Sequence, residues 1–148
     1  VAACVRLGRR LKVIGDGPQM GRLRRMADTN VKLLGRRSDE EIRVHLARCR
    51  ALLFCAEEDF GIVPVEAMAA GCPVIAFGRG GATETVVDAQ TGLFFEAQTP
   101  ESIVRAIQRF ETMTDAFHPA SLYARATEFS GDVFASRISA WIEACMRA

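Results

Sequence analysis

Two acidic residues, Glu58 and Glu66, lie on either side of a glycine turn that follows an apolar run at residues 51–55. Carboxylates form strong, charge-assisted hydrogen bonds with donors such as hydroxyl groups. Pro64 suits the first turn of a helix, because the N–H that it lacks would be unpaired there anyway. The amides of residues 60–63 then lie at the positive helix end, which attracts phosphate. The sequence predicts an anion-binding site at this turn, with Glu66 in the first helical turn.

A second glycine loop, Gly78-Arg79-Gly80-Gly81, follows another apolar run at residues 74–77. Continuous apolar runs of this kind are typical of buried parallel strands. Since both loops follow strands, both should lie at the carboxyl edge of a parallel sheet, where such sheets bind ligands. Glycines at this edge would let the backbone approach a ligand closely.

Strands and helices alternate from residue 11 to residue 112, which predicts an α/β fold with a Rossmann-like parallel sheet flanked by helices. We expect residues 1–115 to form this domain, and residues 116–148 to form a C-terminal helical extension that packs on it. The expected strands are residues 11–14, 31–34, 51–55, 74–77 and 93–95.

Local signals place several of the helices. Ser38 and Glu41 form a capping box at the start of one helix. Residues 83–88 are expected to form a short helix that carries Val86 and Val87. The last segment of the chain has an apolar stripe at helical spacing, which we interpret as core packing. The members of this stripe are Phe134, Ile138, Trp141, Ile142 and Cys145.

The first loop resembles the Glu-x7-Glu signature of retaining, sugar-nucleotide-dependent glycosyltransferases of the GT-B type, the glycosyl transferases group 1. Glu58 and Glu66 match its two acids, and Phe60-Gly61 matches the Phe-Gly between them. Four further blocks resemble this family in the same order, at residues 12–18, 31–35, 80–84 and 91–94. They cover roughly residues 11–110, so the resemblance implies the C-terminal, donor-binding half of a two-domain enzyme.

The resemblance implies that Glu66 binds the ribose hydroxyls of the donor, and that Glu58, the candidate catalytic residue, faces the hydroxyls of the sugar. The amides of the first loop would cap the diphosphate, and the second loop would form a close wall beside sugar and acceptor. The loop after the first strand would lie close to the ligand, and the loop after the second strand near the nucleobase. The candidate donor-binding residues are Phe60, Gly61, Ile62, Val63, Glu66, Gly15, Gly17, Arg36, Gly80 and Gly81.

Simpler interpretations stay open at four positions. Asp16 could cap the helix that follows it, and Arg36 could be a solvated surface residue. Glu58 could be one solvated acid in an acidic run. Glu84 could reach the pocket or simply lead the next helix.

The reaction that the resemblance implies is transfer of a sugar from a nucleoside diphosphate to an acceptor hydroxyl, with retention of the anomeric configuration. The residues from Gly80 onward look most like bacterial mannosyltransferases of polysaccharide or lipopolysaccharide assembly that use GDP-mannose. The sequence contains no Asp-x-Asp, so we expect no metal and no cofactor.

In the resembled enzymes, an Arg and a Lys that bind the departing diphosphate would precede Val1, and the acceptor site lies on an amino-terminal domain. We therefore expect the chain by itself to be inactive, with an acceptor glycan or glycolipid bound through that missing domain. The first strand of the domain would also be missing, which should leave an unpaired edge or an internal gap in the sheet. Such an edge favours self-association, so a homodimer stays open.

The composition fits a soluble globular domain, since 49% of the 148 residues are hydrophobic and 25% are charged. The net charge of +1 gives no field that would attract nucleic acid. The five cysteines include no Cys-x-x-Cys, and we expect reduced, mostly buried thiols in a cytoplasmic protein. Peripheral association of the full-length enzyme with the inner face of the membrane stays open.

Two other functions are compatible with a Rossmann-like domain. One is a non-catalytic nucleotide-binding module. The other is an NAD-type dehydrogenase, which the glycine pattern disfavours, because Gly15-x-Gly17 has Met20 where the third glycine would stand.

Overall fold

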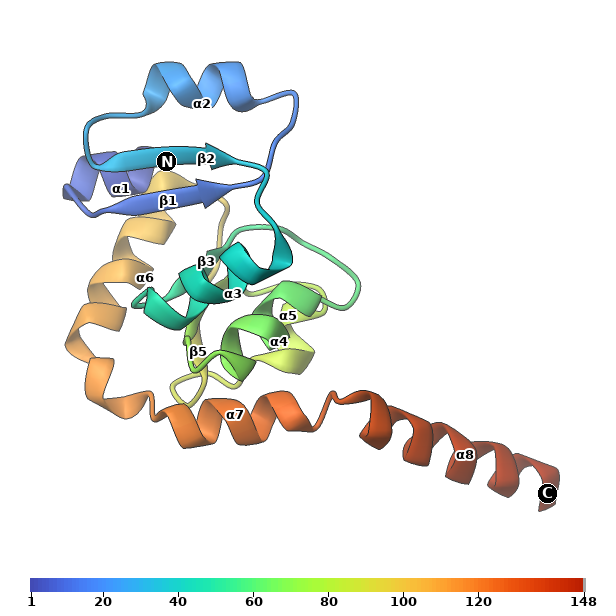
Figure 1. Ribbon diagram of the computed structural model, residues 1–148. Coiled ribbons are helices and arrows are strands. Elements are labelled where there is room, and N and C mark those ends of the chain that lie inside the picture. The colour runs from blue at the N-terminus through green and yellow to red at the C-terminus, as the bar shows by residue number, and fades with distance from the viewer. Residues whose placement is uncertain (148) are drawn as a thin grey trace.

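The computed structural model describes residues 1–147, so the last residue of the predicted helical extension, Ala148, lies outside the described residues. Five parallel strands alternate with helices, which confirms the predicted α/β class (Figure 1). The strands are β1 (Leu11–Ile14), β2 (Val31–Gly35), β3 (Leu52–Phe54), β4 (Val74–Phe77) and β5 (Gly92–Phe95). The helices are α1 (Ala2–Leu7), α2 (Met20–Met26), α3 (Asp39–Arg48), α4 (Ile62–Ala69), α5 (Ala82–Thr85), α6 (Pro100–Thr112), α7 (Pro119–Thr127) and α8 (Gly131–Arg147), with a short 3₁₀ helix at Thr114–Ala116.

Strand β4 is the centre of the core, because it pairs with β3 on one side and with β5 on the other. All four of its residues are buried. Val74 and Ala76 contribute to an apolar cluster with residues of α4 and α7, whereas Ile75 and Phe77 contribute to a second cluster with residues of α6. Successive side chains of a strand point to opposite faces, so helices cover both faces of this sheet. This explains why residues 74–77 form a continuous apolar run.

Strands β1 and β2 form a second, separate parallel sheet, and no ladder within residues 1–147 joins it to the three-stranded sheet. The segment between α1 and β1 links the two parts, because its Arg9 guanidinium binds the Glu111 carboxylate of α6 through two hydrogen bonds of 2.6 and 2.9 Å. The Asn30 amide, before β2, donates to the carbonyl oxygens of Cys4 and Arg9.

The helix boundaries confirm some local predictions and correct others. Ser38 and Glu41 form the predicted capping box at α3. Helix α4 begins at Ile62, so Glu66 lies in its second turn and not in the first as predicted. The short helix predicted over residues 83–88 forms as α5, but it ends at Thr85, so Val86 lies beyond it in extended backbone and the prediction that the helix carries Val86 and Val87 is wrong. Val86 instead packs into the core cluster beneath α4.

The C-terminal helices differ from one another in their packing. Helix α7 packs on α4, and its Leu122 is fully buried. Helix α8 extends away from the rest of the molecule and buries none of its side chains (Figure 1). Phe134 and Trp141 are 66% and 63% exposed, so the interpretation of the α8 stripe as core packing is wrong. The amphipathic pattern is real, but the structure contains no surface that covers it within residues 1–147.

The exposure of the cysteines corrects one expectation from the sequence. Cys4 and Cys72 are buried, whereas Cys49, Cys55 and Cys145 are exposed, so the prediction of mostly buried thiols is wrong. No helix in the described part of the chain has the length and apolar character needed to cross a membrane.

Gly92 offers a test of the packing around β4. A Cβ atom at this position would overlap the backbone oxygen of Val74, with which Gly92 pairs in the sheet. We expect Gly92→Ala to lower the free energy of unfolding by about 2 kcal/mol or more, because buried backbone cannot give way cheaply. Gly21→Ala on α2 is the control, since its Cβ would meet no atom within 4 Å. Urea unfolding should show the control unchanged or about 0.5–1 kcal/mol more stable. Equal stability of the two variants would contradict this packing.

Candidate functional site

The two glycine loops contact each other through their backbones. The Gly81 amide donates a 2.7 Å hydrogen bond to the carbonyl oxygen of Glu58. Gly80 has φ +63°, and a Cβ on it would lie 2.5 Å from the same oxygen. A Cβ on Gly81 would overlap the backbone of Phe60. Glycine is therefore required at both positions, and the structure brings the backbones of Glu58, Phe60, Gly80 and Gly81 together.

The N-terminus of α4 lies beside this contact. Gly61 precedes the helix in the left-handed conformation, with φ 76° and ψ 62°, and it is buried against Gly81 and Ala82 of the second loop. In the described part of the chain no side chain caps α4, so the amides of its first turn remain available as donors. A helix terminus with free amides favours an anionic group. Ile62 is 59% exposed next to these amides.

Glu58 and Glu66 are both exposed, and within residues 1–147 neither carboxylate takes part in an ion pair. Glu58 belongs to the loop before α4, and Glu66 to the second turn of that helix. Val63, which the sequence also selects, lies in the first turn. Phe60 packs edge-to-face on Phe129, with 5.8 Å between ring centroids, so the first loop is anchored on the segment after α7.

The remaining candidates lie at the ends of β1 and β2. Gly15 continues the ladder by donating to Gly35 over 2.9 Å, and Arg36 is an exposed residue directly after β2. In the described part of the chain, no hydrogen bond or ion pair connects these residues with the two glycine loops. Figure 1 shows the arrowheads of β1 and β2 on the same side of the molecule as the loop that leads into α4.

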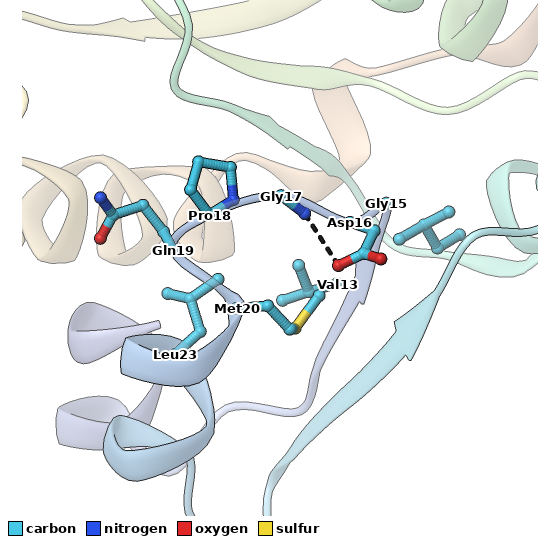
Figure 2. Close-up of a pocket in the computed structure, with 9 residues that line it drawn as sticks. Val13, Gly15, Asp16, Gly17, Pro18, Gln19, Met20 and Leu23 are labelled. Carbon is cyan, nitrogen blue, oxygen red and sulfur yellow. Dashed lines mark hydrogen bonds between the residues drawn. The ribbon is translucent and has the colours of Figure 1, made fainter.

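A cavity of about 290 Å³ lies between β1 and the start of α2, and Figure 2 shows its lining. Gly15 and Gly17 line it together with the apolar side chains of Val13, Met20 and Leu23. The Asp16 carboxylate accepts a 2.8 Å hydrogen bond from the Gly17 amide. Since α2 begins at Met20 with Gln19 before it, Asp16 stabilises the turn and does not cap the helix.

Three side chains that hold the loops were not selected from the sequence. The Thr83 hydroxyl donates to the Gly80 carbonyl over 2.8 Å, a local turn that the residue spacing could have indicated. The Gln98 amide donates to the carbonyl of Cys55 over 2.8 Å, at the end of β3. The Arg125 guanidinium, on α7, donates to the carbonyls of Thr85 and Glu84 at the end of α5. Gln98 and Arg125 are 43 and 40 or more positions from their partners, so no local pattern could reveal them.

Two charged residues, Arg79 and Glu84, lie in or directly after the second loop. Arg79 lies over the Phe77 ring, with the guanidinium carbon 5.8 Å from the ring centroid. The Glu84 backbone is held by Arg125, and its side chain is exposed. Within residues 1–147, no group of three His, Cys, Asp or Glu side chains is arranged to hold a metal ion.

The chain matches the family described as "Glycosyl transferases group 1" over residues 6–128. Among similar proteins, the alpha-1,3/1,6-mannosyltransferase ALG2 of Mus musculus is 33% identical over 78% of this chain and 28% of its own length. A GDP-mannose-dependent alpha-(1-6)-phosphatidylinositol monomannoside mannosyltransferase of Mycobacterium tuberculosis is 32% identical over 68% of this chain and 29% of its own length. This chain therefore spans less than a third of either relative.

The fold is also shared with solved glycosyltransferase structures of the GT-B type. The crystal structure of Anabaena HepE in complex with UDP-glucose superposes with a TM-score of 0.74 at 27% identity, over 91% of this chain and 41% of HepE. Because the family match covers most of the sequence, the chain belongs to the glycosyl transferases group 1 family.

Proposed function

We propose that this chain is the donor-binding domain of a retaining glycosyltransferase, and that a nucleoside-diphosphate sugar binds where the two glycine loops meet. The backbone contact between Gly81 and Glu58 beside the uncapped N-terminus of α4 is the observation that supports this site most strongly. Family membership supports the same chemistry, because the chain belongs to the glycosyl transferases group 1.

Each part of such a donor has a suitable partner at this site. The free amides at the start of α4 can bind the diphosphate. Glu66, exposed on the next turn of the same helix, can accept hydrogen bonds from the ribose hydroxyls. Glu58, on the loop held by Gly81, can accept hydrogen bonds from the hydroxyls of the sugar. The exposed Ile62 and Gly80 would border the ligand.

The loops after β1 and β2 are proposed to lie near the nucleobase end of the donor. Gly15 and Gly17 line the cavity beside β1, and the exposed Arg36 follows β2. Within residues 1–147, no hydrogen bond or ion pair links these loops to α4. Their place in the proposal rests on the directions of β1 and β2, whose ends lie on the same side of the molecule as the loop that leads into α4 (Figure 1). A ligand that reaches from α4 to these loops would bridge the two sheets.

GDP-mannose is the donor that we propose for the complete enzyme, with a role in polysaccharide or lipopolysaccharide assembly in the cytoplasm. Two relatives are named as mannosyltransferases, and one of them is named as GDP-mannose-dependent. HepE, in contrast, is seen with UDP-glucose. Direct comparison of GDP and UDP nucleotides on this chain would separate the two possibilities, and NAD would test the dehydrogenase alternative.

We also propose that the acceptor, a glycan or glycolipid, binds to a segment outside residues 1–148, because this chain spans only 28% and 29% of the two mannosyltransferase relatives. Departure of the diphosphate builds negative charge, which must be stabilised by positioned donors or cations. Arg79, the basic residue of the second loop, lies over Phe77 and has no identified role in that step.

Replacing the proposed ribose ligand should weaken nucleotide binding. We expect Glu66→Gln to raise the Kd for GDP and for GDP-mannose about 10- to 100-fold, because it removes a charged hydrogen-bond acceptor. Isothermal titration calorimetry with GDP, GDP-mannose, UDP, UDP-glucose and NAD would measure this. Glu57→Gln is the matched control, since Glu57 is an exposed acid on the loop before α4 that is not assigned to the ligand. An equal loss of nucleotide affinity in Glu66→Gln and Glu57→Gln would argue against the proposed site. So would tighter binding of NAD than of any other nucleotide tested.

Binding without turnover is the second expected outcome. The chain of residues 1–148, incubated with a panel of sugar nucleotides, should consume none of them at the rate of an ordinary enzyme. We propose that groups outside residues 1–148 stabilise the charge on the departing diphosphate. Loss of one such preorganised donor group typically lowers the rate by about two to three orders of magnitude. Chromatography would measure the release of free GDP or UDP. Turnover of about 1 s⁻¹ or faster would mean that the acceptor site or the charge-stabilising groups lie within this chain.

A further inference from the structure

Two cysteines that are far apart in the sequence lie in contact. Cys49 follows the last residue of α3, and Cys72 stands in the turn between α4 and β4, 23 positions later. Their sulfur atoms are 3.1 Å apart. Cys72 is 1% exposed, whereas Cys49 is exposed at the surface. An accessible thiol therefore touches a thiol that solvent does not reach.

The surroundings of the two thiols differ in a way that favours reaction at Cys49. The hydrogen bond from Cys72 lowers the pKa of the Cys49 thiol to about 7, and the nearby positive charge of Lys12 acts in the same direction, while burial opposes both. The contact with Cys49 and burial both raise the pKa of the Cys72 thiol. The Lys12 ammonium also lies 3.3 Å from the Nδ1 atom of His45, one helical turn before Cys49. Thiolates are the reactive form of cysteine, so this basic environment activates Cys49.

We propose that Cys49 and Cys72 form a reversible disulfide when the protein meets a peroxide. The Cys49 thiolate attacks one oxygen of hydrogen peroxide, an S–O bond forms, the O–O bond breaks, and the hydroxide that leaves takes up a proton to become water. The Cys72 thiol then loses its proton and its sulfur attacks the Cys49 sulfur. The S–O bond breaks and a second water leaves, so two thiols are oxidised and one peroxide is reduced.

The geometry requires only a small adjustment for this bond. The sulfur atoms would have to approach by about 1 Å, because a disulfide has an S–S length of about 2.05 Å. Cys49 is not held in regular helix, since it follows α3 with φ −87° and ψ 156°. Its thiol makes one other polar contact, to the Leu46 carbonyl at 3.3 Å, which rotation of the side chain would release.

The disulfide would enclose the segment that carries the proposed donor site. Residues 50–71 include β3, the loop with Glu58, and the whole of α4 with Glu66. A covalent link between the two ends of this segment restricts the unfolded chain and should stabilise the fold. Disulfides of proteins in reducing compartments are typically transient and redox-sensing, which fits a pair with one accessible member. This inference is independent of the identity of the ligand.

Thiol counting after oxidation tests the proposal. When alkylated in denaturant, the reduced protein should be modified at five cysteines, and prior hydrogen peroxide treatment of the folded protein should lower that number to three, with dithiothreitol restoring five. In the Cys145→Ser variant, which lacks an exposed thiol on α8, the number of alkylated cysteines should fall from four to two. In the Cys49→Ser variant, the number of alkylated cysteines should stay at four after peroxide treatment. Digestion after glutamate in a Cys55→Ser background should yield one linked pair of peptides, since residues 42–57 would then carry only Cys49 and residues 67–84 only Cys72.

A second readout does not depend on any variant folding well. Oxidation of the unmodified chain should raise its Tm by about 5 °C or more, and dithiothreitol should reverse the rise. Retention of five free thiols under peroxide would overturn the proposal. So would an equal loss of thiols in Cys49→Ser, or linkage only between separate molecules on a non-reducing gel.

Discussion

The hydrogen bond from the Gly81 amide to the Glu58 carbonyl is the constraint on which the candidate site depends. It joins the loop after β3 to the loop after β4, and it can form only because neither Gly80 nor Gly81 carries a side chain that would collide with the first loop. The same approach seats Gly61 against the second loop and so fixes where α4 begins. A ligand at this point would meet free helix amides and an exposed carboxylate from one helix.

The position of these loops is set by the sheet beneath them. Strand β4 is buried on both faces, so the ends of β3 and β4 cannot shift relative to one another without opening the core. Side chains from distant elements complete the support, through Gln98 at the end of β3 and Arg125 at the end of α5. These hydrogen bonds connect segments that are far apart in the sequence, and the one from Arg125 to Thr85 is partly buried, so together they help to hold the two loops in one arrangement. A preformed site of this sort loses less free energy to ordering when a ligand binds.

Residues with strong local signals were predictable from the sequence. The apolar run at residues 74–77 and the capping box of Ser38 identified their elements, and the glycine loops indicated the edge of the sheet at which the site was expected. Glu66 was placed one turn too early, because the left-handed Gly61 lets α4 begin at Ile62. Periodicity showed that α8 is amphipathic but could not show whether another surface covers it. The contact of Cys49 with Cys72 depends on how α3 packs beside the turn before β4, which no local pattern encodes.

Amide hydrogen exchange with and without a nucleoside diphosphate would locate the bound nucleotide on the chain. We expect GDP or UDP to slow exchange in the segment around Gly61 to Val63 and around Gly80 and Gly81, while α8 exchanges as before. Slower exchange confined to residues 13–23, or to no segment at millimolar nucleotide, would contradict a donor site between the two glycine loops.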